Sequence, residues 1–217
     1  VQANLAGVNK WETQVSDIFN EHIRLSKENI TENTCIVIWP ETAIPTEVFD
    51  NVALSQTLID FSIENDITLI TGSFANEDGK SYNAMYVISP DGTVSEPYYK
   101  QLLVPFGEFT PLKRVISVLA FWVTNTEGLL NDMGRGDECI VYDTPYGSLS
   151  GLICYESILP SISTSHTSLG SELTVLISND SWFGTSSALK QHLSHAVLRA
   201  VENNRYVARA GNCGITA

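Results

Sequence analysis

Short apolar runs and amphipathic helical patterns alternate along the chain, and this alternation limits the folds that the chain can adopt. An apolar stripe within residues 11–23 fits one face of a helix and precedes the run CIVIW at 35–39. A second stripe within 54–61 precedes the run ITLITGSF at 67–74. Strands as apolar as CIVIW are typical of sheets whose outer faces are covered by helices. The pattern therefore predicts an α/β fold.

The remaining patterns extend this arrangement to the end of the chain. A PDG turn at 90–92 separates two strand-like runs and is typical of a hairpin. The sequence has no internal repeat and no low-complexity linker, so we expect one domain over residues 1–217. The last expected helix carries an apolar stripe of Leu189, Leu193, Ala196, Val197 and Ala200. The expected strands are 35–39, 67–74, 82–88, 93–99, 139–142, 149–154, 173–178 and 206–210.

The charge balance argues against two classes of partner. The chain has 12 Lys and Arg against 25 Asp and Glu, a net charge of −13 at pH 7, and it has no basic stripe. Nucleic acids and anionic lipid surfaces attract basic proteins, so any membrane contact of this chain must be apolar. No stretch approaches the roughly 20 apolar residues that span a bilayer.

The four cysteines are scattered without CxxC spacing, which suggests neither a zinc knuckle nor a dense disulfide framework. We expect Cys35 to be buried in its apolar run, and Cys139 and Cys213 could pair only if the fold brings them together. Cys154 differs from the others, because it ends the apolar run GLIC and a carboxylate, Glu156, follows two residues later.

Three expected strands end in side chains that together suit acyl transfer: Glu41, Lys100 and Cys154. A thiol with an ordinary pKa of about 8.5 attacks as thiolate, so it needs a base or a nearby cation. We expect Glu41 to accept the thiol proton, and Lys100 to favour the thiolate and stabilise an oxyanion. Each residue alone would more often be a turn carboxylate, a solvated lysine or a small buried apolar residue.

The sequence motifs around these residues resemble those of the nitrilase, or carbon-nitrogen hydrolase, superfamily, whose Glu-Lys-Cys triad has this chain order. Within it the chain is similar to the nitrilase-like domain of the apolipoprotein N-acyltransferase family. The resemblance runs along the whole chain. The words that carry it are WPETAIP at 39–45, LVPFGE at 103–108, ICYE at 153–156, SNDSWFG at 178–184, QH at 191–192, RAVE at 199–202 and NCGITA at 212–217.

The resemblance implies an α-β-β-α sandwich with Glu41 as general base, Lys100 as oxyanion stabiliser and Cys154 as nucleophile. Glu108 would support the lysine and the base, and Tyr155 and Glu156 would shape the substrate pocket. The implied reaction moves a fatty acyl chain from a phospholipid, through a cysteine thioester, to the α-amino group of the diacylglyceryl-cysteine of an apolipoprotein. It requires no cofactor and no metal.

The resemblance also implies a place in the cell. Enzymes of this family act in the bacterial cytoplasmic (inner) membrane, with the catalytic domain on the extracytoplasmic side. The chain begins at Val1 and lacks the family's membrane helices and last strands. We therefore expect it to be excised from a membrane protein and incomplete at its C-terminus. It departs from the family at Cys213, where the usual word has Asn, which puts a side-chain amide contact in doubt.

Two further segments have alternative interpretations. The apolar run 115–123 could be a lipid-facing arm next to the site, with Phe106 and Phe109 on the same surface, or an ordinary buried helix. Its arm-forming residues would be Val115, Ile116, Leu119, Phe121 and Trp122. The segment with Asn179, Trp182 and Phe183 could form the pocket wall opposite the thiol or a simple turn. His192 and His195 share a helical face, and we favour packing or hydrogen bonding over metal binding, because no third ligand has suitable spacing.

Two other functions remain open. A soluble hydrolase of a small amide or nitrile would use the same triad with water as acceptor, and it would lack an exposed apolar arm. A silent binding module would keep the fold without the chemistry, and the presence of Glu41, Lys100, Glu108 and Cys154 together argues against it.

Overall fold

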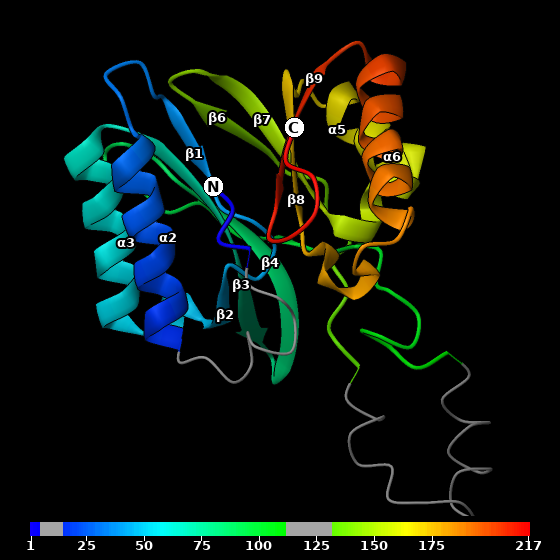
Figure 1. The fold of residues 1–217 in the computed structure, drawn as a ribbon, viewed down its shortest axis with the longest axis horizontal. Coiled ribbons are helices and arrows are strands. Elements are labelled where there is room, and N and C mark those ends of the chain that lie inside the picture. Colours follow the sequence, from blue (N-terminus) through cyan, green and yellow to red (C-terminus); the bar gives the residue numbers. More distant parts are fainter. Residues whose placement is uncertain (5–14, 112–131) are drawn as a thin grey trace, which may run out of the picture.

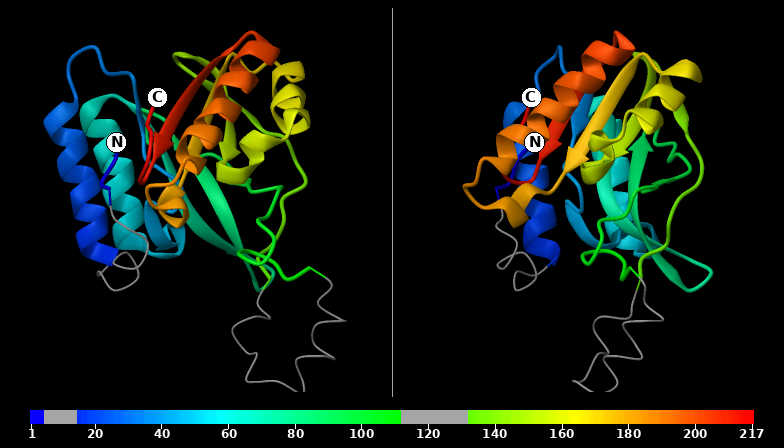
Figure 2. Two further views of the ribbon diagram at one scale, coloured as in Figure 1. Left: turned by 45° about the vertical axis from the view of Figure 1, so that its right-hand side comes forward. Right: turned by 90° about the vertical axis from the view of Figure 1, so that its right-hand side faces the viewer.

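Two β-sheets lie face to face between two pairs of helices (Figure 1). The computed structural model describes residues 1–4, 15–111 and 132–217. Helices α2 and α3 cover the outer face of one sheet, and α5 and α6 cover the outer face of the other, as the left view of Figure 2 also shows. This arrangement confirms the predicted α-β-β-α sandwich. The arm residues expected at 115–122 and the start of the first expected helix lie outside the described residues.

The first sheet has the strand order β1-β3-β4-β5, with β2 also paired to β3. Strands β1 and β2 run parallel to β3, whereas β4 is antiparallel to both β3 and β5. The elements of this half are α2 (Val15–Asn29), β1 (Ile36–Ile38), β2 (Ile44–Glu47), η1 (Val48–Asp50), α3 (Val52–Asn65), β3 (Thr68–Glu77), β4 (Lys80–Ile88) and β5 (Tyr98–Tyr99).

The second sheet has the order β6-β7-β8-β9, in which β7, β8 and β9 are parallel and β6 pairs antiparallel with β7. The elements of this half are β6 (Val141–Thr144), β7 (Gly147–Ile153), η3 (Cys154–Ile158), α5 (Pro160–Ser168), β8 (Leu173–Ser178), η4 (Asp180–Phe183), α6 (Ala188–Asn203) and β9 (Tyr206–Gly211).

Neighbouring residues of the central strands enter different cores. Leu69 packs with the α2–α3 side, while Ile70 packs between the two sheets. Likewise Leu176 faces α5 and α6, while Ile177 faces the first sheet. Successive side chains of a strand point to opposite faces, so both faces of these strands are buried and most positions are apolar or carry a small hydroxyl. This is the physical origin of the continuous apolar runs in the sequence.

The chain turns sharply where β1 ends, and this turn presents Glu41. Trp39 still donates its N–H to the Ile70 carbonyl, at 2.8 Å, but Pro40 has no N–H and cannot continue the ladder. A Cβ at Gly72 of β3 would lie 2.6 Å from the Pro40 carbonyl oxygen and 2.8 Å from the Glu41 Cα. Glycine is therefore required at residue 72 for the turn to lie against the strand.

Three expectations about single segments are wrong. Cys35 is exposed rather than buried, because β1 begins one residue later, after the turn at 31–34. Val197 is 54% exposed, because the buried face of α6 consists of His192, Ala196 and Arg199 and is rotated from the expected stripe. In the expected strand 93–99 only the last two residues form a strand, since Pro97 cannot donate to a ladder.

We predict that Gly72→Ala lowers the free energy of unfolding by about 1–3 kcal/mol, because the added methyl group overpacks the turn that carries Glu41. Urea unfolding of both proteins measures the change. Gly107→Ala is the control, since a Cβ there would make only an ordinary contact, 3.5 Å from the Val104 side chain. Equal stability of Gly72→Ala and the parent protein would contradict the close approach.

Candidate functional site

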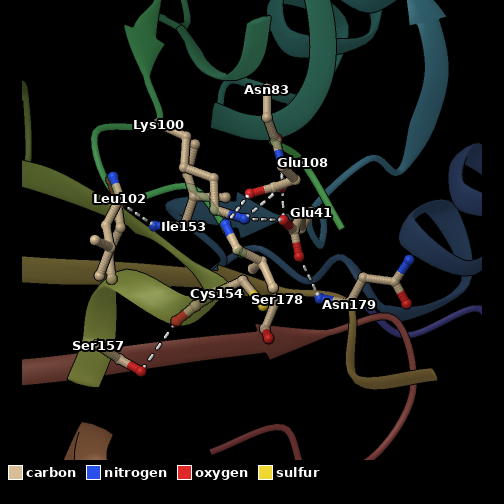
Figure 3. A network of polar contacts seen from close by, with 12 residues as sticks. Glu41, Asn83, Lys100, Leu102, Glu108, Ile153, Cys154, Ser157, Ser178 and Asn179 are labelled. Atoms are coloured by element: carbon tan, nitrogen blue, oxygen red, sulfur yellow. Dashed lines mark hydrogen bonds and ion pairs between the residues drawn. The ribbon is translucent and has the colours of Figure 1, made fainter. Parts of the chain in front are cut away.

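A buried ammonium group lies at the centre of the candidate site (Figure 3). Lys100 directly follows β5 and is 1% exposed, and its Nζ donates to Glu41 Oε1 at 3.0 Å and to Glu108 Oε1 at 2.7 Å. Burial lowers the pKa of Lys100, but the charges of Glu41 and Glu108 outweigh it and hold the pKa above its ordinary value. The side chain is therefore a fixed cation at neutral pH.

Both carboxylates are held by further hydrogen bonds. The Asn83 amide donates to Glu41 Oε1 at 2.7 Å and to Glu108 Oε1 at 3.2 Å. The Asn179 backbone N–H donates to Glu41 Oε2 at 2.7 Å, and the Val104 N–H donates to Glu108 Oε2 at 2.8 Å. These bonds tie the turn after β1 to the end of β8, and so they join the two sheets at the site.

Asn83 is a site residue that the sequence analysis missed. It lies inside β4 and is 2% exposed, between strand neighbours that pack into the cores. A buried amide in a strand needs a polar partner, and here it has two carboxylates. The available signal was a lone polar residue within the otherwise apolar run of residues 82–88.

Cys154 follows directly on the last residue of β7 and has a backbone φ of 52°, in the left-handed region. Burial and the negative charge of Glu41 raise the pKa of its thiol to about 12. The Lys100 ammonium lowers the same pKa and thus favours the thiolate, as expected, but its effect on the pKa is smaller than the combined effect of burial and Glu41. At neutral pH the group is a neutral thiol next to a carboxylate.

Glu156 is fully buried and does not line the cavity described below. Its Oε2 accepts the Ile153 N–H at 2.6 Å, and its Oε1 accepts the Gln101 N–H at 2.5 Å and the Tyr98 hydroxyl at 3.0 Å. Burial raises the pKa of Glu156 to about 7, although these hydrogen bonds lower it. One side chain thus connects the segment that follows Lys100 to the residue that precedes Cys154.

A cavity of about 620 Å³ opens above these groups. Its polar floor contains Glu41, Lys100, Glu108 and Cys154, and its sides are mainly apolar. Phe106 and Trp182 belong to its lining and are 74% and 84% exposed, so large aromatic surfaces border the opening. The rest of the lining is Val104, Pro105, Gly107, Tyr155, Ile158, Asn179, Phe183, Ala188, Gln191, His192 and His195.

The cavity brings together most of the residues that the sequence analysis selected. Tyr155, Asn179, Trp182 and Phe183 all line it. The segment that contains the last three therefore contributes to the cavity lining. Val115, Ile116, Leu119, Phe121 and Trp122 lie outside the described residues.

The described residues contain one group that could hold a metal ion: Cys154, Asp180 and His192, whose ligand atoms lie within 4.8 Å of one another. Both Asp180 oxygens and both ring nitrogens of His192 already face hydrogen-bond partners in the protein. The Arg209 guanidinium lies 2.6 Å from Asp180 and competes with any cation for that carboxylate. A metal would have to displace several of these bonds, so the geometry favours a hydrogen-bonded network.

The sequence pattern of the carbon-nitrogen hydrolase family matches residues 1–217. The chain belongs to that family. The chain is similar to the apolipoprotein N-acyltransferases of Geobacter metallireducens and Bdellovibrio bacteriovorus. Each is 33% identical to it, in alignments that cover the whole of the present chain. These alignments cover 42% and 43% of the two relatives, so the chain spans about two fifths of their length.

Solved structures share the fold at lower identity. Saccharomyces cerevisiae Nit3, of branch 10 of the nitrilase superfamily, matches 91% of this chain with a TM-score of 0.68 and 18% identity, over 70% of its own length. An amidase from Nesterenkonia sp. matches 93% of this chain with a TM-score of 0.62 and 19% identity, over 70% of its length. One mutant of the Nesterenkonia sp. AN1 amidase shows the result of Michael addition of acrylamide at its active site cysteine. In the described part of the present chain, none of the helices has the length and apolar character that crossing a membrane requires.

We predict opposite pH shifts for two variants of this carbon-nitrogen hydrolase. Glu41→Gln removes a negative charge that raises the Cys154 pKa, so its thiolate appears at lower pH than in the parent protein. Lys100→Met removes a cation that lowers the same pKa, so its thiolate appears at higher pH. The thiolate absorbance in the ultraviolet, corrected with Cys154→Ala, reports the fraction at each pH. Shifts in the same direction would contradict the charge arrangement.

Proposed function

We propose that this chain is the catalytic domain of a lipoprotein N-acyltransferase, in which Cys154 carries a fatty acyl group from a phospholipid to the α-amino group of an apolipoprotein's diacylglyceryl-cysteine. The observation that carries the proposal is a buried Lys100 ammonium, held by two carboxylates, beside a neutral thiol at the floor of an apolar cavity. The chemistry follows from these groups in two half-reactions.

In the first half-reaction Glu41 accepts the proton of the Cys154 thiol as the sulfur attacks the ester carbonyl of the phospholipid. A neutral thiol requires such a base, since its raised pKa leaves almost no thiolate at neutral pH. The carbonyl oxygen becomes an oxyanion, which the Lys100 ammonium stabilises. When the ester C–O bond breaks, the leaving alkoxide takes the proton from Glu41, and a lysophospholipid departs.

In the second half-reaction the free amine attacks the thioester carbonyl, and the C–S bond breaks. Glu41 accepts a proton from the attacking nitrogen and returns it to the sulfur. The products are an amide and the original thiol, so the cycle needs no cofactor. Glu108 keeps Lys100 in place by accepting from its ammonium, and Asn83 keeps both carboxylates in place by donating to Glu41 and to Glu108.

The surroundings of the thiol suit a lipid substrate. Val104, Pro105, Ile158 and Ala188 line the cavity with apolar atoms, and the exposed rings of Phe106 and Trp182 border its opening. Burying an acyl chain against these side chains supplies binding energy that a small polar amide would not use. The net charge of −13 does not favour electrostatic binding to an anionic membrane surface. A membrane contact of this chain would therefore be apolar, and the apolar rim of the cavity suits such a contact.

The relatives support the proposed setting. The proteins from Geobacter and Bdellovibrio are apolipoprotein N-acyltransferases and are more than twice as long as the matched region. In this proposal the domain lies on the extracytoplasmic side of a bacterial inner membrane, within a longer protein whose other segments enter the bilayer. Residues 115–123 would form the lipid-facing arm beside the cavity.

The alternative is a carbon-nitrogen hydrolase that uses the same residues with water as acceptor, as the family match and the amidase fold permit. The two functions differ in the acceptor and in the need for lipid. The full-length protein, given phospholipid and a diacylated lipopeptide with a free α-amino group, should N-acylate the peptide. Hydrolysis of small amides without transfer to the lipopeptide would favour the alternative.

We predict that Lys100→Met lowers the rate of acyl transfer by about 10²-fold or more, the usual scale for loss of an oxyanion stabiliser. Transfer of a labelled acyl chain to the lipopeptide by the full-length protein measures the rate. Lys190→Met is the matched control, because this exposed lysine of α6 does not line the cavity. Near-parental transfer by Lys100→Met would exclude the proposed role of the ammonium.

A further inference from the structure

A second buried polar network lies on the other side of the Cys154 backbone, and the reaction above does not use it. It joins Asp180 after β8, His192 of α6 and Arg209 of β9, which are 1%, 5% and 2% exposed. Asp180 Oδ2 accepts from Arg209 Nη2 at 2.6 Å, and Asp180 Oδ1 accepts from the Ser178 hydroxyl at 2.6 Å and lies 2.9 Å from His192 Nδ1. Two charged groups thus hold the imidazole from one side.

The opposite nitrogen of the imidazole faces the candidate nucleophile. His192 Nε2 lies 3.0 Å from the backbone carbonyl oxygen of Cys154. A carbonyl oxygen can only accept a hydrogen bond, so Nε2 must carry the proton. This assignment holds whether Nδ1 donates to Asp180 or accepts from Arg209 Nη2, which is 3.3 Å away. His192 is therefore a donor to the Cys154 peptide and has no lone pair available at Nε2 for the thiol proton.

The Cys154 peptide needs such support. A φ of 52° lies in the left-handed region, which non-glycine residues rarely adopt, so surrounding contacts must maintain it. The Cys154 carbonyl accepts from His192 and also from the Ser157 hydroxyl, at 3.0 Å. On the preceding side, Glu156 holds the Ile153 N–H. The backbone that directs the thiol toward the cavity is thus fixed from both sides.

We propose that His192 is a positioning residue whose Nε2–H, oriented by Asp180 and Arg209, holds the Cys154 carbonyl and so fixes the left-handed backbone that presents the thiol to Glu41 and Lys100. This role rests on the proposed function, because it assigns His192 to the acyl-transfer step through Cys154. It predicts that loss of the Nε2–H donor lowers the rate of the acyl-transfer step, while the affinity for phospholipid is little changed.

Two amide variants separate the two ends of the imidazole. In His192→Gln the side-chain amide reaches the place of Nε2 and can donate to the Cys154 carbonyl. In His192→Asn the shorter side chain reaches only the place of Nδ1, next to Asp180. We expect the full-length His192→Asn protein to lose about 10²-fold in kcat with KM for phospholipid unchanged, and His192→Gln to recover at least about tenfold of that loss. His166→Gln, at a buried histidine of α5 outside the cavity lining, controls for loss of an imidazole and should keep the parental kcat.

Equal losses in His192→Gln and His192→Asn, or a parental kcat in both, would overturn the positioning role. A second measurement does not need turnover or a folded variant. In ¹⁵N NMR of the full-length protein labelled at histidine ring nitrogens, His192 should show a protonated Nε2, and an unprotonated Nε2 would overturn the proposal. If the parent protein transfers no acyl group to the lipopeptide, the proposed function fails, and the NMR result still decides whether His192 donates to Cys154.

Discussion

The buried Lys100 ammonium, with Glu41 and Glu108 at 3.0 and 2.7 Å, is the interaction on which the arrangement of the site depends. Removing a charge from water costs several kcal/mol, and only close opposite charges and further hydrogen bonds compensate that cost. Both carboxylates therefore have to stay within hydrogen-bond distance of the ammonium. The Asn179 backbone N–H also fixes Glu41, and the Val104 backbone N–H fixes Glu108. One cation in this way connects the turn after β1, the end of β5 and the end of β8. Replacing an entire buried charge cluster with apolar side chains of similar volume is often neutral for stability, so chemistry explains this cluster better than folding does.

The same charges define the state of the thiol. Burial and the Glu41 carboxylate raise the Cys154 pKa to about 12, and Lys100 offsets only part of that. In the proposed reaction Lys100 therefore acts on the oxyanion, and Glu41 moves the proton. The second network, of Asp180, His192 and Arg209, then has a separate role, since it acts on the Cys154 backbone and not on its sulfur.

The sequence predicted the parts of this structure that depend on local pattern. Both faces of the strands are buried, so apolar runs marked them. Glu41, Lys100 and Cys154 were selected because each lies at or just past an expected strand end and because the motifs around them resemble those of a known family. Contacts between distant segments left no such local pattern. Asn83 lies 42 residues from Glu41, and His192 lies 38 residues from Cys154, so neither partnership could be read from spacing. Glu156 was expected in the pocket, but its carboxylate turns inward because two segments, residues 98–102 and the end of β7, direct hydrogen-bond donors at it. The raised thiol pKa depends on burial, which no motif reports.

Mass spectrometry of the full-length protein incubated with phospholipid, without any amine acceptor, tests the central claim most directly. The account predicts that the protein gains one fatty acyl group in place of one hydrogen, that the group maps to the peptide containing Cys154, and that hydroxylamine releases it as expected for a thioester. Acyl transfer by a Cys154→Ala protein, or an acyl group on any other residue, would contradict the account.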